Sequence, residues 1–258
     1  MKFLTVDIPE DHAYLIPIGD IHFGDPAFQT DGLKKLIGYL EWVKERPNAR
    51  VFINGDLFNV GSRSSATSPF QTDPKEYENA IDFFEPYAKY IIGATMGNHE
   101  NRMEDEFGVN PLQLFCRALS IPYCKYSAAV RIRVGKRGEK SGNRYFQSYY
   151  IYFHHSTGGG ATIGGKLNRV VKLREIIEGI DVFCGSHNHQ LAAAPQDIFY
   201  PSAQGGVKKR RMWFVDCGSF LSWEDSYAEK AMLPPSKLGS PRIRLSGEQQ
   251  NKDVHVSL

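Results

Sequence analysis

The amino-acid sequence predicts a layered α/β fold, and three observations support this class. Short apolar runs bounded by turn residues have the pattern of buried strands. Segments with helical periodicity alternate with these runs. The chain has 258 residues, of which 41% are hydrophobic and 23% are charged, so it can bury a core without disulfide bonds. We expect a single domain over residues 1–258 that becomes less regular from about residue 225.

The expected elements follow one another along the chain in an alternating order. Strands are expected in the β-branched and aromatic runs 13–19, 50–55, 90–97, 148–153, 181–185 and 212–218. Helices are expected over 31–46, from Asp73-Pro74, from Asn110-Pro111 and over 168–178, because apolar residues there recur at helical spacing or Pro occupies a first helical position. Residues 253–258 are expected to form a last edge strand.

The composition also predicts a cellular compartment. No run of 18 apolar residues is present, so no membrane span and no membrane partner are expected. Asp7, Glu10 and Asp11 stand where a secretory signal would be apolar. The four cysteines form no CxxC pair and are typical of reduced core thiols. We therefore expect a cytoplasmic protein.

Six of the eight histidines follow the ends of expected strands. The blocks at these ends are Asp20-Ile21-His22, Gly55-Asp56, Gly97-Asn98-His99-Glu100, His154-His155 and His187-Asn188-His189. In open α/β sheets ligands bind at the rim beyond the carboxyl ends of the strands. Asp-x-His and His-x-His place two side chains on the same side of an extended segment. A single such block is usually a turn or a core histidine, but five together predict a metal site.

The types of side chain in these blocks indicate the metals. Imidazole and carboxylate groups together favour Mn, Fe, Zn or Ni over Ca or a purely oxygen-ligated Mg site. Seven or eight such groups are too many for one tetrahedral ion. They suffice for two divalent ions that share a carboxylate. Manganese is the expected metal, with Fe, Zn, Ni or Mg as alternatives.

The five blocks, in this order over residues 20–189, resemble the calcineurin-like metallophosphoesterase superfamily. The stretch from His155 to Asn168, with its glycine-rich loop, also resembles the phage-encoded branch of that superfamily. The resemblance implies a four-layer α/β/β/α sandwich with a two-metal site at the strand ends. It implies a hydrolase that cleaves phosphate esters with a hydroxide bridging the metals.

The resemblance also implies a role for each matching residue. Asp20, His22 and His189 would hold one metal, and Asp56 would bridge both. The second metal would be held by Asn98, His155 and His187. His99 would stand beside the metals without binding them, as a catalytic general acid for the leaving oxygen, oriented by Glu100 or by a backbone carbonyl.

Two positions depart from the superfamily pattern. The usual His-Gly of the fourth block is His154-His155-Ser156 here, and alignment of the following glycines favours His155 over His154 as the ligand. In the fifth block Ser186 replaces a glycine, which requires that Ser186 can adopt the necessary backbone angles.

The charge distribution bears on the substrate. Residues 1–129 hold 12 basic and 18 acidic residues, whereas residues 130–258 hold 19 and 11. Basic clusters occur at 131–144 and 208–211, and Lys166 and Arg102 are candidate substrate-binding residues. Such clusters favour DNA or RNA as partner, although solvated hairpin tips have the same composition.

Three functions are compatible with these features. We expect a phosphodiesterase, most specifically a nuclease. A phosphomonoesterase for nucleotides, metabolites or phosphoproteins is the first alternative. A binding scaffold without turnover is the second, and it is disfavoured because every ligand block and His99 are intact.

Overall fold

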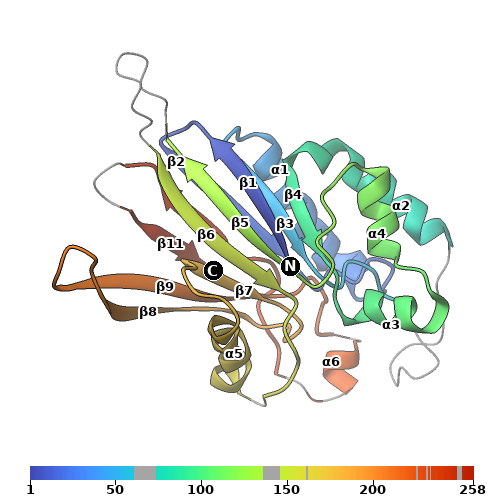
Figure 1. The fold of residues 1–258 in the computed structure, drawn as a ribbon. Coiled ribbons are helices and arrows are strands. Elements are labelled where there is room, and N and C mark those ends of the chain that lie inside the picture. Colours follow the sequence, from blue (N-terminus) through green and yellow to red (C-terminus); the bar gives the residue numbers. More distant parts are fainter. Residues whose placement is uncertain are drawn as a thin grey trace.

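Two β-sheets form the centre of the protein in the computed structural model (Figure 1). The structure describes residues 1–60, 74–135, 146–160, 162–224, 226–230, 232, 234–248 and 252–258. The larger sheet has the strand order β1-β5-β6-β7-β9-β8. Its strands are β1 (Lys2–Ile8), β5 (Ser127–Val134), β6 (Gln147–His154), β7 (Val182–Gly185), β8 (Leu191–Pro201) and β9 (Val207–Cys217).

The smaller sheet has the order β11-β10-β2-β3-β4. Its strands are β2 (His12–Ile18), β3 (Ala49–Asn54), β4 (Ile91–Thr95), β10 (Arg242–Ser246) and β11 (Val254–Ser257). In this sheet β2, β3 and β4 run parallel, and in the larger sheet β6, β7 and β9 do so. The carboxyl ends of parallel strands meet at one edge of their sheet, where the connecting loops can build a site.

Helices cover the outer face of each sheet. The described helices are α1 (Leu33–Lys44), α2 (Pro74–Phe84), α3 (Asn98–Phe107), α4 (Pro111–Ala118), α5 (Ile163–Val171) and α6 (Tyr227–Lys230), with short turns η1 (Phe28–Gly32), η2 (Glu85–Tyr90) and η3 (Lys172–Glu175). Residues of α1, α2 and α4 pack on the smaller sheet, and those of α5 and η3 on the larger one. The four-layer α/β/β/α prediction is confirmed.

A third apolar layer lies between the sheets and holds them together. Phe52 of β3 and Phe153 of β6 stack there with ring centroids 3.7 Å apart and an interplanar angle of 11°. Both rings are fully buried. Because Phe52 and Phe153 each precede a metal-ligand block by a few residues, their packing sets the distance between the strand ends that carry those blocks.

Most expected elements are present, with two changes of extent. Asn110 caps α4 through its side chain, which accepts a hydrogen bond from Gln113 N at 3.0 Å. The helix expected over 168–178 is α5, and it begins earlier than expected, at Ile163. Thr162 caps it, and the Gly164-Gly165 pair forms its first turn. The strand expected at 212–218 is the end of the 11-residue β9, which pairs with β8 along its whole length. In the part of the chain that the structure describes, no helix has the length and apolarity needed to span a membrane.

Candidate metal centre

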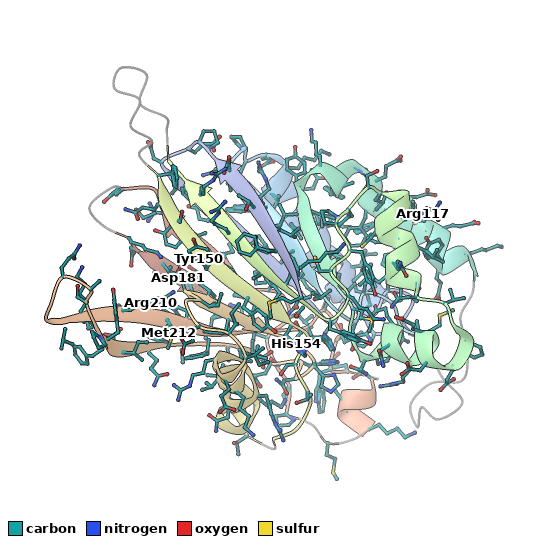
Figure 2. All side chains as sticks on the ribbon, viewed as in Figure 1. Arg117, Tyr150, His154, Asp181, Arg210 and Met212 are labelled. Atoms are coloured by element: carbon teal, nitrogen blue, oxygen red, sulfur yellow. The ribbon has the colours of Figure 1, made fainter. Side chains whose placement is uncertain are left out.

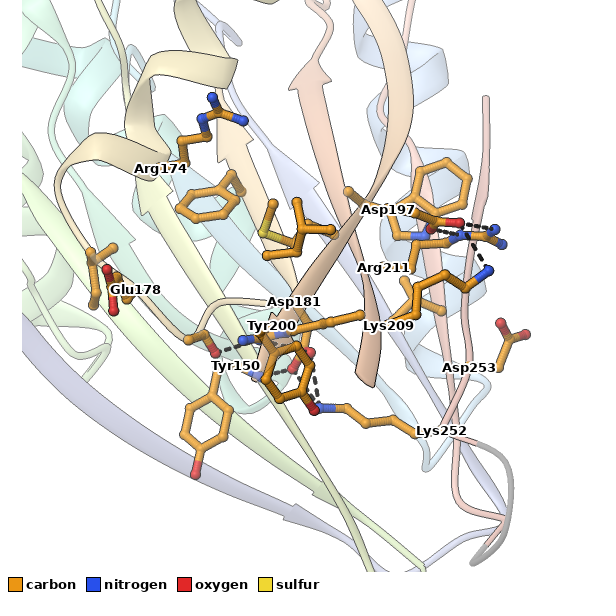
Figure 3. Close-up of a pocket in the computed structure, with 18 of the residues that line it drawn as sticks. Tyr150, Arg174, Glu178, Asp181, Asp197, Tyr200, Lys209, Arg211, Lys252 and Asp253 are labelled. Carbon is orange, nitrogen blue, oxygen red and sulfur yellow. Dashed lines mark hydrogen bonds and ion pairs between the residues drawn. The ribbon is translucent and has the colours of Figure 1, made fainter. Parts of the chain in front are cut away.

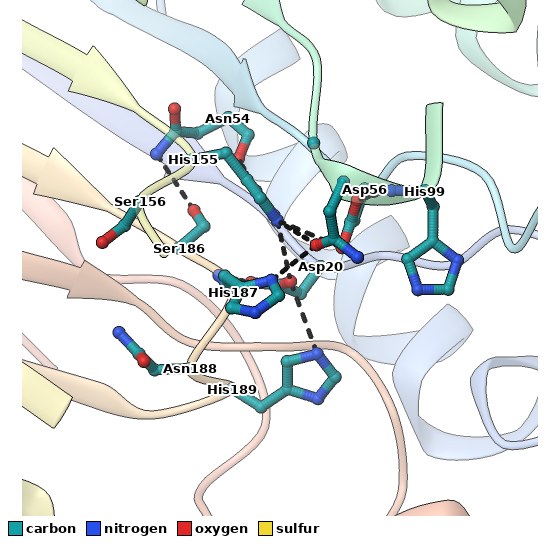
Figure 4. A network of polar contacts seen from close by, with 12 residues as sticks. Asp20, Asn54, Asp56, His99, His155, Ser156, Ser186, His187, Asn188 and His189 are labelled. Carbon is teal, nitrogen blue, oxygen red and sulfur yellow. Dashed lines mark hydrogen bonds and ion pairs between the residues drawn. The ribbon is translucent and has the colours of Figure 1, made fainter. Parts of the chain in front are cut away.

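The five sequence blocks converge at one edge of the two sheets (Figure 4). Asp20 and His22 follow β2, Asp56 follows β3, and Asn98 and His99 open α3 just after β4. His155 follows β6, and His187 and His189 lie between β7 and β8. The seven predicted metal ligands therefore come from both sheets and face a common centre.

One group of potential ligand atoms belongs to Asp20, His22 and His189, all within 4.8 Å of one another. His189 Nε2 lies 3.4 Å from Asp20 Oδ1, and His22 Nε2 lies 3.9 Å from the same oxygen. These are the three residues that the resemblance implies for the first metal.

A second group consists of Asp56, His155 and His187, again with ligand atoms within 4.8 Å. His155 Nε2 is 3.1 Å from Asp56 Oδ2. The same Asp56 oxygen is 3.9 Å from His22 Nε2 of the first group. Asp56 thus occupies the position between the two groups that a bridging carboxylate requires.

The side-chain amide of Asn98 lies beside the second group. One of its terminal atoms is 2.5 Å from His187 Nδ1 and 3.2 Å from His155 Nε2, and the other is 2.5 Å from Arg102 Nη2. With nitrogen toward the histidines and oxygen toward Arg102, every amide hydrogen bond is satisfied. The opposite orientation presents the amide oxygen to the centre, as a ligand would.

The backbone at the ligand positions is unusual. Asp20, His22, Asp56, His187 and His189 all have positive φ, between 49° and 74°. Non-glycine residues rarely adopt this region, and it persists where the surroundings enforce it, often at functional sites. The left-handed turns redirect the chain directly after the strands and aim these side chains at the centre.

Two glycines allow the blocks to approach one another. A Cβ atom on Gly55, whose φ is +84°, would collide with the His155 ring. A Cβ atom on Gly97 would collide with the Asp56 carboxylate. The Gly-Asp and Gly-Asn-His spacing in the sequence therefore has a steric cause.

Burial and charge shift the ionisation of the central groups in opposite directions. Burial by itself would raise the pKa of Asp56, but nearby His155 holds that pKa well below its ordinary value. Burial lowers the pKa of His22 to about 3, and the charge of His99 acts in the same direction. Burial by itself would lower the pKa of His155, yet the carboxylates of Asp56 and Asp20 raise that pKa to about 10. The buried carboxylates thus require positive charge close by.

The residues present fit divalent metal ions. Within the described ranges, Asp20 Oδ1 and His22 Nε2 are buried without a hydrogen bond of good geometry, although His189 lies 3.4 Å from that oxygen. Buried polar atoms normally have a hydrogen-bond partner or bind an ion. A cation bound at the centre would be the partner of these two atoms. The mixture of imidazole and carboxylate donors suits a transition metal or Mn.

His99 lies at the border of the centre. Its Nδ1 is 3.2 Å from the carbonyl oxygen of Val60, and its ring makes an edge contact with His22 at 4.6 Å between centroids. A backbone carbonyl therefore orients His99, one of the two expected possibilities. Glu100 does not: its buried carboxylate accepts hydrogen bonds from the N–H groups of Asp56, Phe58 and Gly97.

The remaining candidates take different places. His154 belongs to none of the potential ligand groups, and its Nδ1 accepts a hydrogen bond from Ser156 N at 2.8 Å. Arg102 reaches the centre through Asn98. The Lys166 carbonyl oxygen lies 3.5 Å from Asn188 Nδ2, so Lys166 flanks the centre on α5. Of the basic segment 131–144, Arg131 and Arg133 lie on β5 and residues 136–144 lie outside the described residues. Val134 and Gln147, on either side of that gap, pair at the strand ends opposite the centre.

Sequence reasoning missed two sets of supporting residues. Asn54 donates from its side chain to Ser186 Oγ at 3.0 Å, and its carbonyl oxygen is 2.9 Å from His155 Nδ1. Asn188 donates to the buried Asp216 carboxyl at 3.0 Å. Neither contact has a local signal in the sequence, because the partners are 28 to 132 positions apart.

The profile of the calcineurin-like phosphoesterase family matches residues 15–191. Among solved structures, the chain is similar to Vps29 of Chaetomium thermophilum, with 12% sequence identity, 95% of this chain and 96% of that chain covered, and a TM-score of 0.40. No curated protein gave a significant match. The family profile spans every block that builds the centre, and the chain belongs to the calcineurin-like phosphoesterase family.

Proposed function

We propose that this chain is a two-metal phosphodiesterase. The observation that carries the proposal is the position of Asp56, whose Oδ2 lies 3.9 Å from His22 of one potential ligand group and 3.1 Å from His155 of the other. A carboxylate shared by two groups of imidazole ligands is the arrangement that a two-metal hydrolytic site needs.

The proposed ligand sets follow the two groups. Asp20, His22 and His189 hold one ion, and Asn98, His155 and His187 hold the other, with Asp56 shared. When bound, divalent ions there lower the pKa of a water molecule and neutralise charge on a phosphate ester. The hydrogen bond between His155 Nδ1 and the Asn54 carbonyl fixes the ring so that Nε2 faces the centre.

Two residues beside the ligands complete the reaction. His99 donates from Nδ1 to the Val60 carbonyl, so a proton for the leaving oxygen would come from Nε2 of the doubly protonated imidazolium. Arg102 Nη2 lies 2.5 Å from the side-chain amide of Asn98, so the guanidinium is placed to contact a phosphate oxygen held at the centre. A positioned acid typically contributes about 10²- to 10⁴-fold in rate.

A diester is the proposed substrate class because cations extend beyond the centre. Lys166 and Arg169 lie on α5 next to the His187 loop, where they would meet a second phosphate of a longer substrate. Manganese is the proposed metal, since mixed imidazole, carboxylate and amide donors suit it.

The test compares two chromogenic substrates with Mn²⁺-loaded protein. We expect bis-p-nitrophenyl phosphate, a diester, to be hydrolysed with higher kcat/KM than p-nitrophenyl phosphate, a monoester. A preference for the monoester would replace the diesterase proposal by a phosphomonoesterase. No turnover of either compound, with two ions bound per chain, would contradict the proposed catalysis.

A further inference from the structure

A series of cations extends from the metal centre along the outer face of the larger sheet. Lys166 and Arg169 lie on α5, Lys172 and Arg174 on η3, and Lys208 on β9. We call these five residues, together with Tyr200 of β8, the basic track. The track begins at the centre because the Lys166 carbonyl oxygen lies 3.5 Å from Asn188 Nδ2, between His187 and His189.

Strand register places the hairpin part of the track on the same side as α5. Ile198 packs in the apolar cluster formed with α5 and η3, and Arg174 Nη1 donates to Gln196 Oε1 at 2.8 Å. Side chains two apart in a strand share a face, so Tyr200 lies on this face with Gln196 and Ile198. Lys208 is directly opposite Tyr200 in the β8–β9 pairing, so the two residues lie on the same face of the hairpin.

The cations of the track lack carboxylate partners. Within the described residues, none of the five has a carboxylate oxygen within ion-pair distance; Arg174 and Lys208 donate only to the side chains of Gln196 and Gln204. Two exposed carboxylates, Glu175 beside Arg174 on η3 and Glu178 shortly after it, are outnumbered by the cations. The track is therefore a surface of net positive charge.

A cavity whose walls include Arg174 and Tyr200 of the track also holds cations that are paired with carboxylates (Figure 3). This cavity has a volume of 1070 Å³. On its walls Asp181 pairs with Arg210 and Lys252, and Asp197 pairs with Lys209 and Arg211. Figure 2 shows Arg210 and Asp181 side by side at this place. These four cations share two carboxylates, whereas Arg174 on the same wall has no carboxylate within ion-pair distance among the described residues.

We infer that the basic track binds single-stranded nucleic acid and leads it to the metal centre; this rests on the proposed diesterase function. Cations without carboxylate partners that continue away from a hydrolytic centre match a polyanion that carries a phosphate at every nucleotide. Tyr200 is 41% exposed, so an unpaired base can stack on its ring. Duplex DNA has no unpaired base for this contact.

The test measures binding of a fluorescent single-stranded phosphorothioate oligonucleotide, which resists hydrolysis, to the Mn²⁺-loaded protein. We expect Lys172→Glu/Arg174→Glu to weaken binding by roughly tenfold or more and to reduce the slope of log K against log salt by about 1.4. The matched control is Lys34→Glu/Lys44→Glu, which makes the same charge change on α1, in the opposite outer layer. It should change affinity by less than about twofold because salt screens distant charges.

Further arms separate this inference from general charge effects. Tyr200→Ala should weaken single-strand binding by roughly tenfold and leave duplex binding unchanged. Melting temperature and metal content verify that each variant is folded. Equal losses of oligonucleotide affinity in the track and control variants would overturn the inference. Equal binding of duplex and single strand, with no effect of Tyr200→Ala, would also overturn it. So would inorganic polyphosphate that competes as strongly as the oligonucleotide. Hydrolysis of bis-p-nitrophenyl phosphate by the unaltered protein tests the proposed function separately, because that assay involves neither the oligonucleotide nor the altered residues of the track.

Discussion

The side-chain amide of Asn54 donates a hydrogen bond to the hydroxyl of Ser186 across 3.0 Å, and this contact ties the two sheets together behind the metal centre. Asn54 ends β3 just before Asp56, and Ser186 immediately precedes His187. Asn54 Oδ1 accepts a further hydrogen bond from Thr95 Oγ1 at 2.9 Å, and all three residues are fully buried. A satisfied buried polar network holds its members in one arrangement.

This network predicts the behaviour of Asn54→Ala. Loss of the amide leaves the Thr95 and Ser186 hydroxyls without their partner, which should lower the free energy of unfolding by about 2–4 kcal/mol. Affinity for Mn²⁺, measured by titration calorimetry, should fall roughly tenfold because the support of the ligands is lost. Asn48→Ala is the matched control: Asn48 is buried and donates to His12 O, far from the centre. An equal loss of metal affinity in both variants would argue against a positioning role for Asn54.

Asp56→Asn should remove the shared ligand. An amide presents only one oxygen and no charge, so we expect the number of Mn²⁺ ions bound per chain to fall and activity on bis-p-nitrophenyl phosphate to be lost. Elemental analysis after gel filtration measures the first and an absorbance assay the second. Full retention of two ions would show that Asp56 is not the bridge.

His99→Ala should separate chemistry from metal binding. The metal content should stay as in the unaltered protein, while kcat falls by about 10²- to 10⁴-fold. The fall should be largest for diesters with poor leaving groups, which depend most on protonation. His255→Ala, an exposed histidine of β11, controls for the loss of an imidazole. A reduced metal content in His99→Ala would instead make His99 a ligand, as its proximity to His22 and Asp56 allows.

Phe52→Ala should destabilise the interface between the sheets. Removal of a fully buried ring that stacks on Phe153 leaves a cavity, at a cost of about 3–5 kcal/mol in the free energy of unfolding. Urea denaturation measures the change. Phe199→Ala removes the same ring at a position that is 74% exposed, and there we expect a change within about 0.5 kcal/mol.

Removal of metal should lower thermal stability. Ions that bind only the folded chain stabilise it by about 2.7 kcal/mol when the free concentration is 100 times the Kd. A melting curve with Mn²⁺ should therefore lie above one recorded with chelator, and Asp56→Asn should reduce the difference. Identical melting temperatures with and without Mn²⁺ would be inconsistent with the proposed site.

The sequence predicted the central strands well because each is an apolar run. It did not predict β1, β8 or β10, nor the helix α3 that begins at Asn98. In β8 the exposed residues from Gln196 onward break the apolar pattern, because this part of the strand extends beyond the core. The start of α5 was also missed, since Gly164 and Gly165 are typical of a loop until Thr162 is seen to cap the first turn.

Within the site, local sequence sufficed to name the chemical groups and their order. Each block is short, and a strand end followed by Asp, Asn or His directs those groups to the rim of a sheet. Residues that support them from another sheet, such as Asn54 for Ser186 and Asp216 for Asn188, leave no such mark.

The sequence by itself determined which side chains are available for the centre and that they belong to the calcineurin-like phosphoesterase family, because spacing within a block is fixed by the chain. Only the tertiary structure decided that His155 rather than His154 faces Asp56, that Val60 rather than Glu100 orients His99, and that the 136–144 segment is flanked by strand ends remote from the centre. These outcomes depend on how two sheets pack face to face. Packing brings together atoms more than a hundred residues apart, and no local pattern encodes that distance.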